Sequence, residues 1–226
     1  MKLKTLKKII YSFFKNLQET IYVIYDSKFK YKKKDRVLFL DLGANIGQAY
    51  NWFSKFFKGE NIDFELFEPN PYCFQKLKEL KEVRQGKVKI RNLGVGTKNK
   101  KVKFYGLNQK NKYSLGGSTL KEHNSLFYTN EQNEFIDVEV IDLGEYLLKK
   151  SKKYNKIIVK MDIEGSEVEI LENLIQTNNN KLINVLYVEF HSQYRSAKQA
   201  EFIKIKELKI INSLKLINTL STRIWH

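Results

Sequence analysis

Residues 37–47 read Val37-Leu38-Phe39-Leu40-Asp41-Leu42-Gly43-Ala44-Asn45-Ile46-Gly47. The apolar run at the start of this segment predicts a buried β-strand, and the two glycines allow a tight turn from the strand into a helix. The turn lacks the Gly-x-Gly-x-x-Gly fingerprint of dinucleotide-binding proteins, and it lacks the Gly-Lys-Ser/Thr ending of a P-loop. It therefore predicts a strand, turn and helix unit that binds a ligand of another kind.

The rest of the chain continues this alternation of short apolar runs and amphipathic segments. We expect further strands at Phe64–Phe67, Val88–Leu93, Ile157–Met161 and Asn184–Phe190, with an additional pair at Val102–Tyr105 and Phe135–Val140. We expect helices through residues 52–57 and at Tyr72–Val83, Leu143–Lys150, Glu167–Leu174 and Ala197–Ser213, and one last strand or hairpin after Leu214. Strands that alternate with helices across glycine turns are typical of a parallel α/β sheet.

A long polar segment, Gly106–Glu134, separates the two strands of the additional pair. Segments of this length inside a compact domain are usually functional or flexible. It carries the aromatic residues Tyr113, Phe127 and Tyr128, which suit stacking on a sugar ring. We expect either a lid over an acceptor or an ordinary surface excursion.

A second acidic residue, Glu68, ends the second predicted strand, 27 residues after Asp41. Neighbouring strands of a parallel sheet end side by side at the ligand crevice. A carboxylate at that point is well placed to accept hydrogen bonds from both hydroxyls of a ribose. A glycine turn together with this acid predicts a ligand that contains adenosine and lacks a pyrophosphate.

Charged residues also follow the last two buried strands. Asp162 and Glu164 lie beyond the strand that ends at Met161, and Glu189 and His191 lie at the end of the next strand. A buried strand end is an unfavourable place for a charge, which favours a functional role for Asp162. Two assignments stay open: Asp162 or His191 as a general base, or a Mg²⁺ or Mn²⁺ ion held by Asp162, Glu164 and Glu189.

The composition limits the class of protein. The chain has 226 residues, of which 42% are hydrophobic, and a single cysteine, Cys73, so it forms no internal disulfide. The single cysteine suits a reducing compartment, and we expect a soluble, cytoplasmic location. The net charge of +16 comes from 41 basic residues, only five of which are arginines. Arginine is the preferred ligand of phosphates and guanine edges, so nucleic acid is an unlikely partner despite the charge.

Half of the net charge lies in residues 1–36, with eleven basic and three acidic side chains. Apolar residues recur there at helical spacing, at Leu3, Leu6, Ile10, Phe13, Leu17 and Ile21. This pattern predicts a basic amphipathic helix and a connector before one domain over residues 37–226. The helix either packs on its own domain, contacts a membrane surface peripherally, or forms part of a dimer; the oligomeric state is left open.

Several motifs now occur in an order that is similar to one known family. They are Asp41-Leu-Gly-Ala-Asn-Ile-Gly47, Phe67-Glu-Pro-Asn-Pro71, Leu93-Gly-Val-Gly96, Gly117-Ser-Thr119, Val159-Lys-Met-Asp-Ile-Glu-Gly-Ser-Glu167 and Val188-Glu-Phe-His191. Together they resemble the FkbM family of S-adenosylmethionine-dependent methyltransferases over about two thirds of the chain. The pairing of the first motif with the fifth carries the resemblance.

The resemblance implies a Rossmann-like class I methyltransferase fold, with a mostly parallel sheet and helices on both faces. The tail after the last long helix is short for the antiparallel terminal hairpin of the family, so we expect this hairpin to be trimmed. It implies S-adenosylmethionine as cofactor and O-methylation of a hydroxyl, often on a sugar, a glycan or another small molecule. The implied cofactor residues are Asp41, Gly43, Ala44, Asn45, Gly47, Glu68, Pro69, Asn92, Leu93, Gly94 and Val95. The resemblance implies that Asp162 and Glu164 face the acceptor, and we count His191 with them as a catalytic candidate because of its possible role as a base.

Two other functions stay open at this point. A methyltransferase that acts on RNA or another nucleic acid suits the net charge, although the motif Asn/Asp-Pro-Pro-Tyr/Phe of base-modifying enzymes is replaced by Asp162-Ile-Glu-Gly165. A catalytically silent module that binds surfaces through its basic helix is the other.

Overall fold

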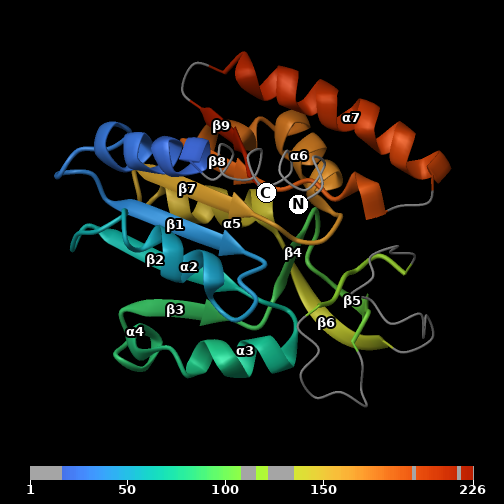
Figure 1. The fold of residues 1–226 in the computed structure, drawn as a ribbon, viewed down its shortest axis with the longest axis horizontal. Coiled ribbons are helices and arrows are strands. Elements are labelled where there is room, and N and C mark those ends of the chain that lie inside the picture. Colours follow the sequence, from blue (N-terminus) through green and yellow to red (C-terminus); the bar gives the residue numbers. More distant parts are fainter. Residues whose placement is uncertain (1–16, 108–115, 122–134, 195–196, 218–219, 226) are drawn as a thin grey trace, which may run out of the picture.

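The computed structural model describes residues 17–107, 116–121, 135–194, 197–217 and 220–225. Its main feature is a six-stranded sheet with the strand order β3-β2-β1-β7-β8-β9 (Figure 1). The strands are β1 (Val37–Leu42), β2 (Ile62–Phe67), β3 (Val88–Arg91), β7 (Lys156–Met161), β8 (Val185–Val188) and β9 (Ser221–Ile224). Every pairing within this sheet is parallel. The predicted α/β fold with a mostly parallel sheet is therefore confirmed.

Helices cover both faces of the sheet because side chains alternate along each strand. Leu38 and Leu40 of β1 belong to one buried cluster, and Val37 and Phe39 belong to the other. The first cluster packs beneath α5 (Leu143–Ser151), α6 (Glu167–Gln176) and α7 (Ala197–Lys215). The second packs beneath α2 (Gln48–Phe53), α3 (Pro71–Lys78) and the helix over residues 17–29. These are the two helical layers of a Rossmann-like fold.

A small second sheet stands beside the main one, with the order β4-β6-β5 (Figure 1). It consists of β4 (Gly94–Gly96), β5 (Lys100–Tyr105) and β6 (Phe135–Asp142). The pair predicted at Val102–Tyr105 and Phe135–Val140 is present as the antiparallel β5–β6 ladder. Short helical turns complete the described chain at α4 (Lys81–Arg84), η1 (Asn179–Leu182) and η2 (Ser192–Tyr194).

Two predicted helices differ from the structure. The helix expected through residues 52–57 is α2, which ends at Phe53. The helix expected over Tyr72–Val83 ends at Lys78 and restarts as α4, because Leu80 takes an extended conformation between them. After α7 the chain forms a single strand, β9, which runs parallel to β8. A last strand was one of the two predicted alternatives, and the described residues contain no terminal hairpin. The helix predicted at Leu143–Lys150 is present as α5, and Asp142 caps it, since its carboxylate accepts the N–H of Glu145.

The helix over residues 17–29 packs on the domain, but through a face that the apolar spacing did not indicate. Val23 is fully buried in the core, and buried Asp26 accepts hydrogen bonds from Tyr187 and Arg223. Leu17 and Ile21 of the expected apolar face are 46% and 55% exposed. Residues 1–16 of the predicted helix lie outside the described residues. None of the described helices is long and apolar enough to span a membrane.

The register of the parallel strands brings their carboxyl ends to one edge of the sheet. Leu42 pairs with Phe67 on one side and with Met161 on the other, and Met161 pairs with Val188. The residues that follow these four positions therefore meet at the same edge. All of the candidate residues beyond β1, β2, β7 and β8 belong to this group.

Candidate active site

The turn after β1 contains three residues with positive φ: Gly43 at 79°, Asn45 at 50° and Gly47 at 93°. A Cβ atom on Gly43 would lie 1.8 Å from the carbonyl oxygen of Asp162. A Cβ atom on Gly47 would lie 3.0 Å from a methyl group of Leu80. The first glycine thus allows the ends of β1 and β7 to approach, and the second allows the turn to pack on the segment between α3 and α4.

Glu68 connects this turn to the end of β2. One carboxylate oxygen accepts the N–H of Asn45 at 2.7 Å, and the other accepts the N–H of Asn70 at 2.8 Å. The side chain is almost fully buried, and burial raises the pKa of its carboxyl to about 7, against the opposing effect of the two backbone N–H groups. Asn92 extends the connection to β3, because its amide donates to the carbonyl oxygen of Glu68 at 2.8 Å.

A pocket opens at this edge of the sheet and holds about 690 Å³, counted with the solvent-open space at its mouth. Nine of the predicted residues line it: Gly43, Asn45, Glu68, Pro69, Leu93, Gly94, Val95, Asp162 and Glu164. Seven residues without a predicted site role also line it: Phe67, Phe104, Gly116, Gly117, Thr119, Ile163 and Ser166. Apolar side chains and glycines together with a few carboxylates are a common lining of a small-molecule or cofactor site.

The remaining six candidates do not face the pocket. Asp41, Ala44, Gly47 and Asn92 are not among the lining residues, and neither are Glu189 and His191. Ala44 is buried in the core beneath α2. Asp41 is buried as well, and burial raises the pKa of its carboxyl while the charge of Lys160 opposes the shift.

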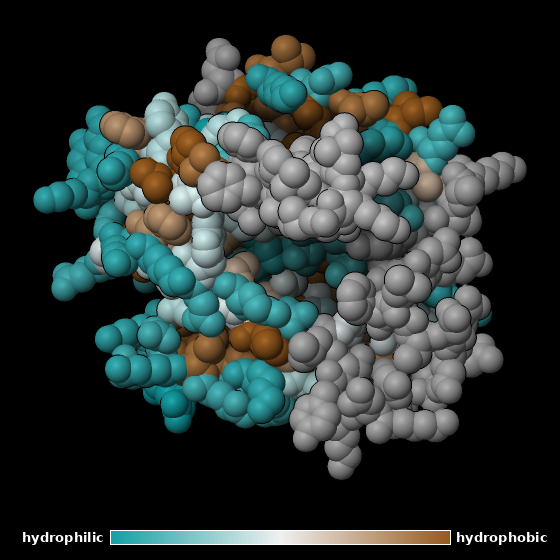
Figure 2. All heavy atoms as spheres, in the orientation of Figure 1, coloured by the Kyte–Doolittle hydropathy of each residue, from teal (hydrophilic) through white to brown (hydrophobic). Residues whose placement is uncertain are grey.

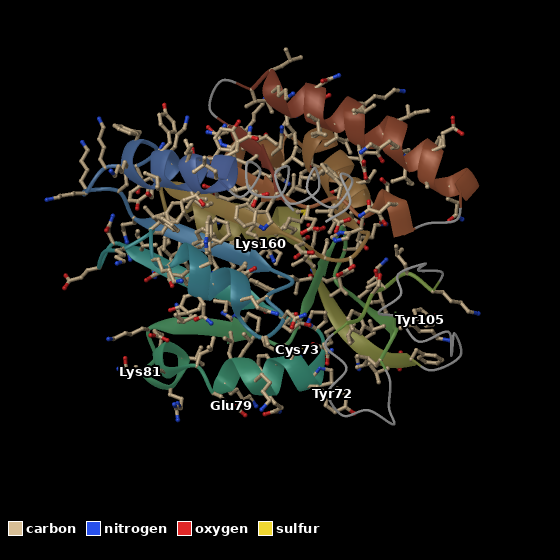
Figure 3. The ribbon with its side chains drawn as sticks, in the orientation of Figure 1. Tyr72, Cys73, Glu79, Lys81, Tyr105 and Lys160 are labelled. Atoms are coloured by element: carbon tan, nitrogen blue, oxygen red, sulfur yellow. The ribbon has the colours of Figure 1, made fainter. Side chains whose placement is uncertain are left out.

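Lys160 was given no role from the sequence. It connects the end of β1 and the turn that follows it to Asp162 at the end of β7. It is 3% exposed, on β7 in the middle of the molecule (Figure 3). Its Nζ lies 3.3 Å from Asp41 Oδ1 and 3.3 Å from Asp162 Oδ2, and it donates to the carbonyl oxygen of Gly43 at 3.2 Å. Burial lowers its pKa, but the charges of Asp41 and Asp162 outweigh burial and raise it. Lys160 therefore stays charged and fixes Asp162 relative to the turn after β1.

His191 is the centre of a cluster of carboxylates. Its Nδ1 lies 2.8 Å from Glu167 Oε1, and its Nε2 lies 3.5 Å from Asp162 Oδ1 and 3.8 Å from Glu164 Oε2. Burial lowers the pKa of the imidazole, but the hydrogen bond to Glu167 and the surrounding carboxylates raise it to about 9. A histidine with this pKa carries its proton near neutral pH, so in this state it donates hydrogen bonds and does not accept a proton.

Glu167 lies in the first turn of α6 and also holds the loop that precedes this helix. Its Oε1 also accepts the N–H groups of Ile163 and Gly165 at 3.1 Å each, so it organises the loop that carries Asp162 and Glu164. Glu189 completes the cluster, with its Oε1 at 3.9 Å from His191 Nε2. Burial, followed by the charge of Asp162, raises the pKa of the Glu189 carboxyl to about 7.

The residues that can hold a metal ion differ by one from the predicted set. Asp162, Glu164 and His191 each offer one ligand atom, and these atoms lie within 4.8 Å of one another. His191 thus takes the place that the sequence gave to Glu189. A carboxylate on the second nitrogen, here that of Glu167, is the usual way in which proteins orient a metal-binding histidine. Two carboxylates with one imidazole suit Mn²⁺ better than Mg²⁺, which prefers oxygen ligands alone.

Residues 116–121 of the long polar segment contribute Gly116, Gly117 and Thr119 to the lining of the pocket. Ser118 is fully buried, pairs with Tyr105 through the backbone, and donates from its hydroxyl to the carbonyl oxygen of Glu164 at 2.7 Å. Glu164 itself has a φ of 59°, an unusual value for a residue other than glycine, and Ser118 holds its carbonyl in place. The predicted aromatic residues Tyr113, Phe127 and Tyr128 lie outside the described residues.

Comparison with known proteins identifies the family of the chain. Residues 41–210 match the methyltransferase FkbM domain. A solved structure of methyltransferase FkbM from Methylobacillus flagellatus KT is similar with a TM-score of 0.45 and 15% sequence identity, over 83% of this chain and 41% of that chain. No curated protein matches the sequence. The matched region contains the turn after β1, Glu68, Asp162 and His191, and the chain belongs to the FkbM methyltransferase family.

Proposed function

We propose that the chain is an S-adenosylmethionine-dependent O-methyltransferase whose acceptor is a hydroxyl of a sugar, a glycan or a related small molecule. Family membership supports methyl transfer. The observation that carries the finer assignment is the continuous pocket that joins the Gly43 turn and Glu68 to the carboxylates of Asp162 and Glu164. One end of this pocket suits a nucleoside, and the other end suits a hydroxyl that has to lose a proton.

The donor end of the pocket has the chemistry that an adenosine requires. Glu68 presents a buried carboxylate for the ribose hydroxyls, while Leu93 and Val95 offer apolar surface to the adenine. Gly43 and Asn45 form the wall on the methionine side. When bound, S-adenosylmethionine supplies a methyl group on a sulfonium, which is already a good leaving group. The chain therefore has mainly to position the two partners and exclude water.

The acceptor end holds groups that polarise a hydroxyl. Asp162 and Glu164 line the pocket with side chains that are 29% and 36% exposed. A sugar hydroxyl is a weak nucleophile at neutral pH and gains from a base within hydrogen-bond reach. Asp162 is our choice for this base, because Lys160 and His191 fix its carboxylate from two sides and His191 already carries a proton.

A divalent metal ion is the alternative to a simple base. Asp162, Glu164 and His191 would hold it, and a bound Mn²⁺ lowers the pKa of a coordinated hydroxyl. Treatment with a chelator decides between the two. Activity that survives the chelator identifies Asp162 as the base, whereas activity that is lost and returns with Mn²⁺ identifies the metal.

The proposed function is tested with labelled S-adenosylmethionine and a panel of monosaccharides, oligosaccharides and RNA. We expect transfer of one methyl group to a carbohydrate hydroxyl, located by mass spectrometry. Transfer to RNA alone would replace the carbohydrate assignment by the nucleic-acid one. Absence of donor binding in calorimetry would contradict the cofactor assignment itself.

A further inference from the structure

The helix over residues 17–29 presents an apolar stripe to solvent. Leu17, Ile21, Ile24, Tyr25 and Phe29 are between 36% and 69% exposed. With a helical repeat of 3.6 residues, these positions share one side, opposite Glu19, Val23 and Asp26, which are buried against the domain. Figure 2 shows apolar spheres over this helix at the left of the molecule. A large apolar patch rimmed by polar residues marks a contact site for a membrane or a protein.

The charges around the stripe are of one sign. In residues 17–36 the three acidic side chains, Glu19, Asp26 and Asp35, are all at least 92% buried. The basic side chains of the same segment, Lys28, Lys30, Lys32, Lys33, Lys34 and Arg36, are exposed or partly exposed. The surface that this segment offers to a partner is therefore apolar and positively charged, and it has almost no acidic component.

Polar contacts between the helix and the domain fix the orientation in which the apolar stripe faces solvent. Asp26 accepts hydrogen bonds from the hydroxyl of Tyr187 at 2.9 Å and from the guanidinium of Arg223 at 3.0 and 3.2 Å. The ring of Tyr22 lies 4.5 Å from the same guanidinium. Rotation of the helix that buried the stripe would expose Asp26 and leave the buried hydroxyl of Tyr187 without its acceptor. The polar contacts therefore select the orientation in which the apolar side faces outward.

We propose that this face of the helix binds the surface of a membrane that contains anionic lipids. Apolar side chains flanked by lysines match the two components of such a surface, the acyl boundary and the negative headgroups. RNA is disfavoured, because the centre of the surface is apolar and the flanking residues are mostly lysines. A second copy of the chain is disfavoured as well, because it would bring two basic rims together. The proposal does not rest on the proposed function.

Vesicle sedimentation of the full chain tests the proposal. We expect binding to phosphatidylcholine vesicles that contain about 30% phosphatidylserine, weaker binding at high salt, and little binding to phosphatidylcholine alone. The double variant Ile21→Asp, Tyr25→Asp should bind at least about tenfold more weakly. Leu148→Asp is the matched control, because Leu148 is 48% exposed and lies on α5, on the other face of the sheet. It should bind like the wild type.

A second pair of variants keeps the test independent of helix stability. Lys32, Lys33 and Lys34 changed together to Gln should weaken binding to anionic vesicles, whereas the same change at exposed Lys76, Lys78 and Lys81 should weaken it much less. Equal loss in both triple variants would indicate a nonspecific charge effect and overturn the proposal. Binding to RNA in preference to vesicles, or a dimer that dissociates when Ile21 is changed to Asp, would also overturn it.

Discussion

Replacement of Asp162 by Asn separates catalysis from donor binding. The change keeps the shape of the side chain and removes its charge, and the side chain is 29% exposed at the pocket. Lys160 loses one of two ion-pair partners but keeps Asp41 at 3.3 Å and the carbonyl oxygen of Gly43 at 3.2 Å. No buried charge is left alone, so we expect the free energy of unfolding to fall by only roughly 1–2 kcal/mol.

The same reasoning predicts how function responds. The proposed donor end of the pocket is formed by Asn45, Glu68 and Leu93, and the Glu68 carboxylate is held there by the N–H groups of Asn45 and Asn70. Donor affinity should therefore stay within about threefold of the wild type, whereas turnover should fall by at least about 10²-fold, the usual contribution of a positioned base or acid.

Calorimetry with S-adenosylmethionine and methyl transfer to the best acceptor are measured on one preparation of each variant. Glu169→Gln is the control, since it neutralises an exposed carboxylate in the first turn of α6. Turnover close to that of the wild type in Asp162→Asn would refute the catalytic role and leave Asp162 as a structural partner of Lys160. Loss of donor affinity with an intact fold would place Asp162 in the donor site instead.

Three further predictions follow from other contacts. Asp26→Ala should lower the free energy of unfolding by roughly 3 kcal/mol, because it leaves the mostly buried Arg223 guanidinium without its carboxylate. Chemical denaturation checks this, and the control Glu79→Ala, in the exposed pair with Lys76, should lower the free energy of unfolding by less than about 1 kcal/mol. Glu68→Gln should weaken donor binding at least about tenfold, since the NH₂ group of its amide would face one of the two backbone N–H groups from which Glu68 now accepts hydrogen bonds. The affinity of the wild type for the donor should rise as the pH is raised through about 7 and Glu68 ionises. Calorimetry of the variant should show no such rise. Gly43→Ala should destabilise the fold as well as abolish donor binding, because its Cβ would meet the Asp162 carbonyl; a thermal midpoint equal to that of the wild type would contradict this.

The strands and helices could be predicted because their signals are local. Each strand is a short apolar run and each helix an amphipathic segment, so a period of two or 3.6 residues suffices to find them. The split between α3 and α4 could not be predicted in this way. Leu77 and Leu80 continue the helical spacing, but both pack against the turn at Gly47, and this contact between distant segments sets the end of α3.

The candidate site was predictable to the extent that it depends on strand ends. The sequence places Asp41, Glu68, Asp162 and Glu189 at the ends of neighbouring strands, and the register brings these ends together. Which of these groups faces the pocket and which stands behind it depends on side-chain directions across strands. The partners of Lys160 and the hydrogen bond between His191 and Glu167 are of this kind. A single lysine within the apolar strand Ile157–Met161 was the one available signal for a buried ion pair.

For the N-terminal helix, the prediction of the buried face was wrong. Its apolar spacing was a sound signal for a helix but a poor guide to the buried face. The face was selected instead by Asp26, whose partners Tyr187 and Arg223 lie more than 160 residues away in the sequence. The helix orientation that keeps a buried polar group fully hydrogen-bonded can be favoured over one that buries more apolar side chains. The reason is that a buried polar group that loses its partners carries the full cost of desolvation.

The distribution of charge bears on the acceptor more directly than the net charge does. The chain carries +16, yet the charged groups that line or back the pocket are mostly acidic: Asp41, Glu68, Asp162, Glu164, Glu167 and Glu189, against Lys160 and His191. Such a site attracts a cationic donor and repels a polyanion, because fields add within a cleft of low dielectric constant. Six basic side chains lie instead within residues 28–36, which lead into the amino end of β1, away from this edge of the sheet. If the acceptor is a sugar, as we propose, we therefore expect it to lack phosphate groups near the reacting hydroxyl, and a phosphorylated sugar should be methylated more slowly than its unphosphorylated counterpart.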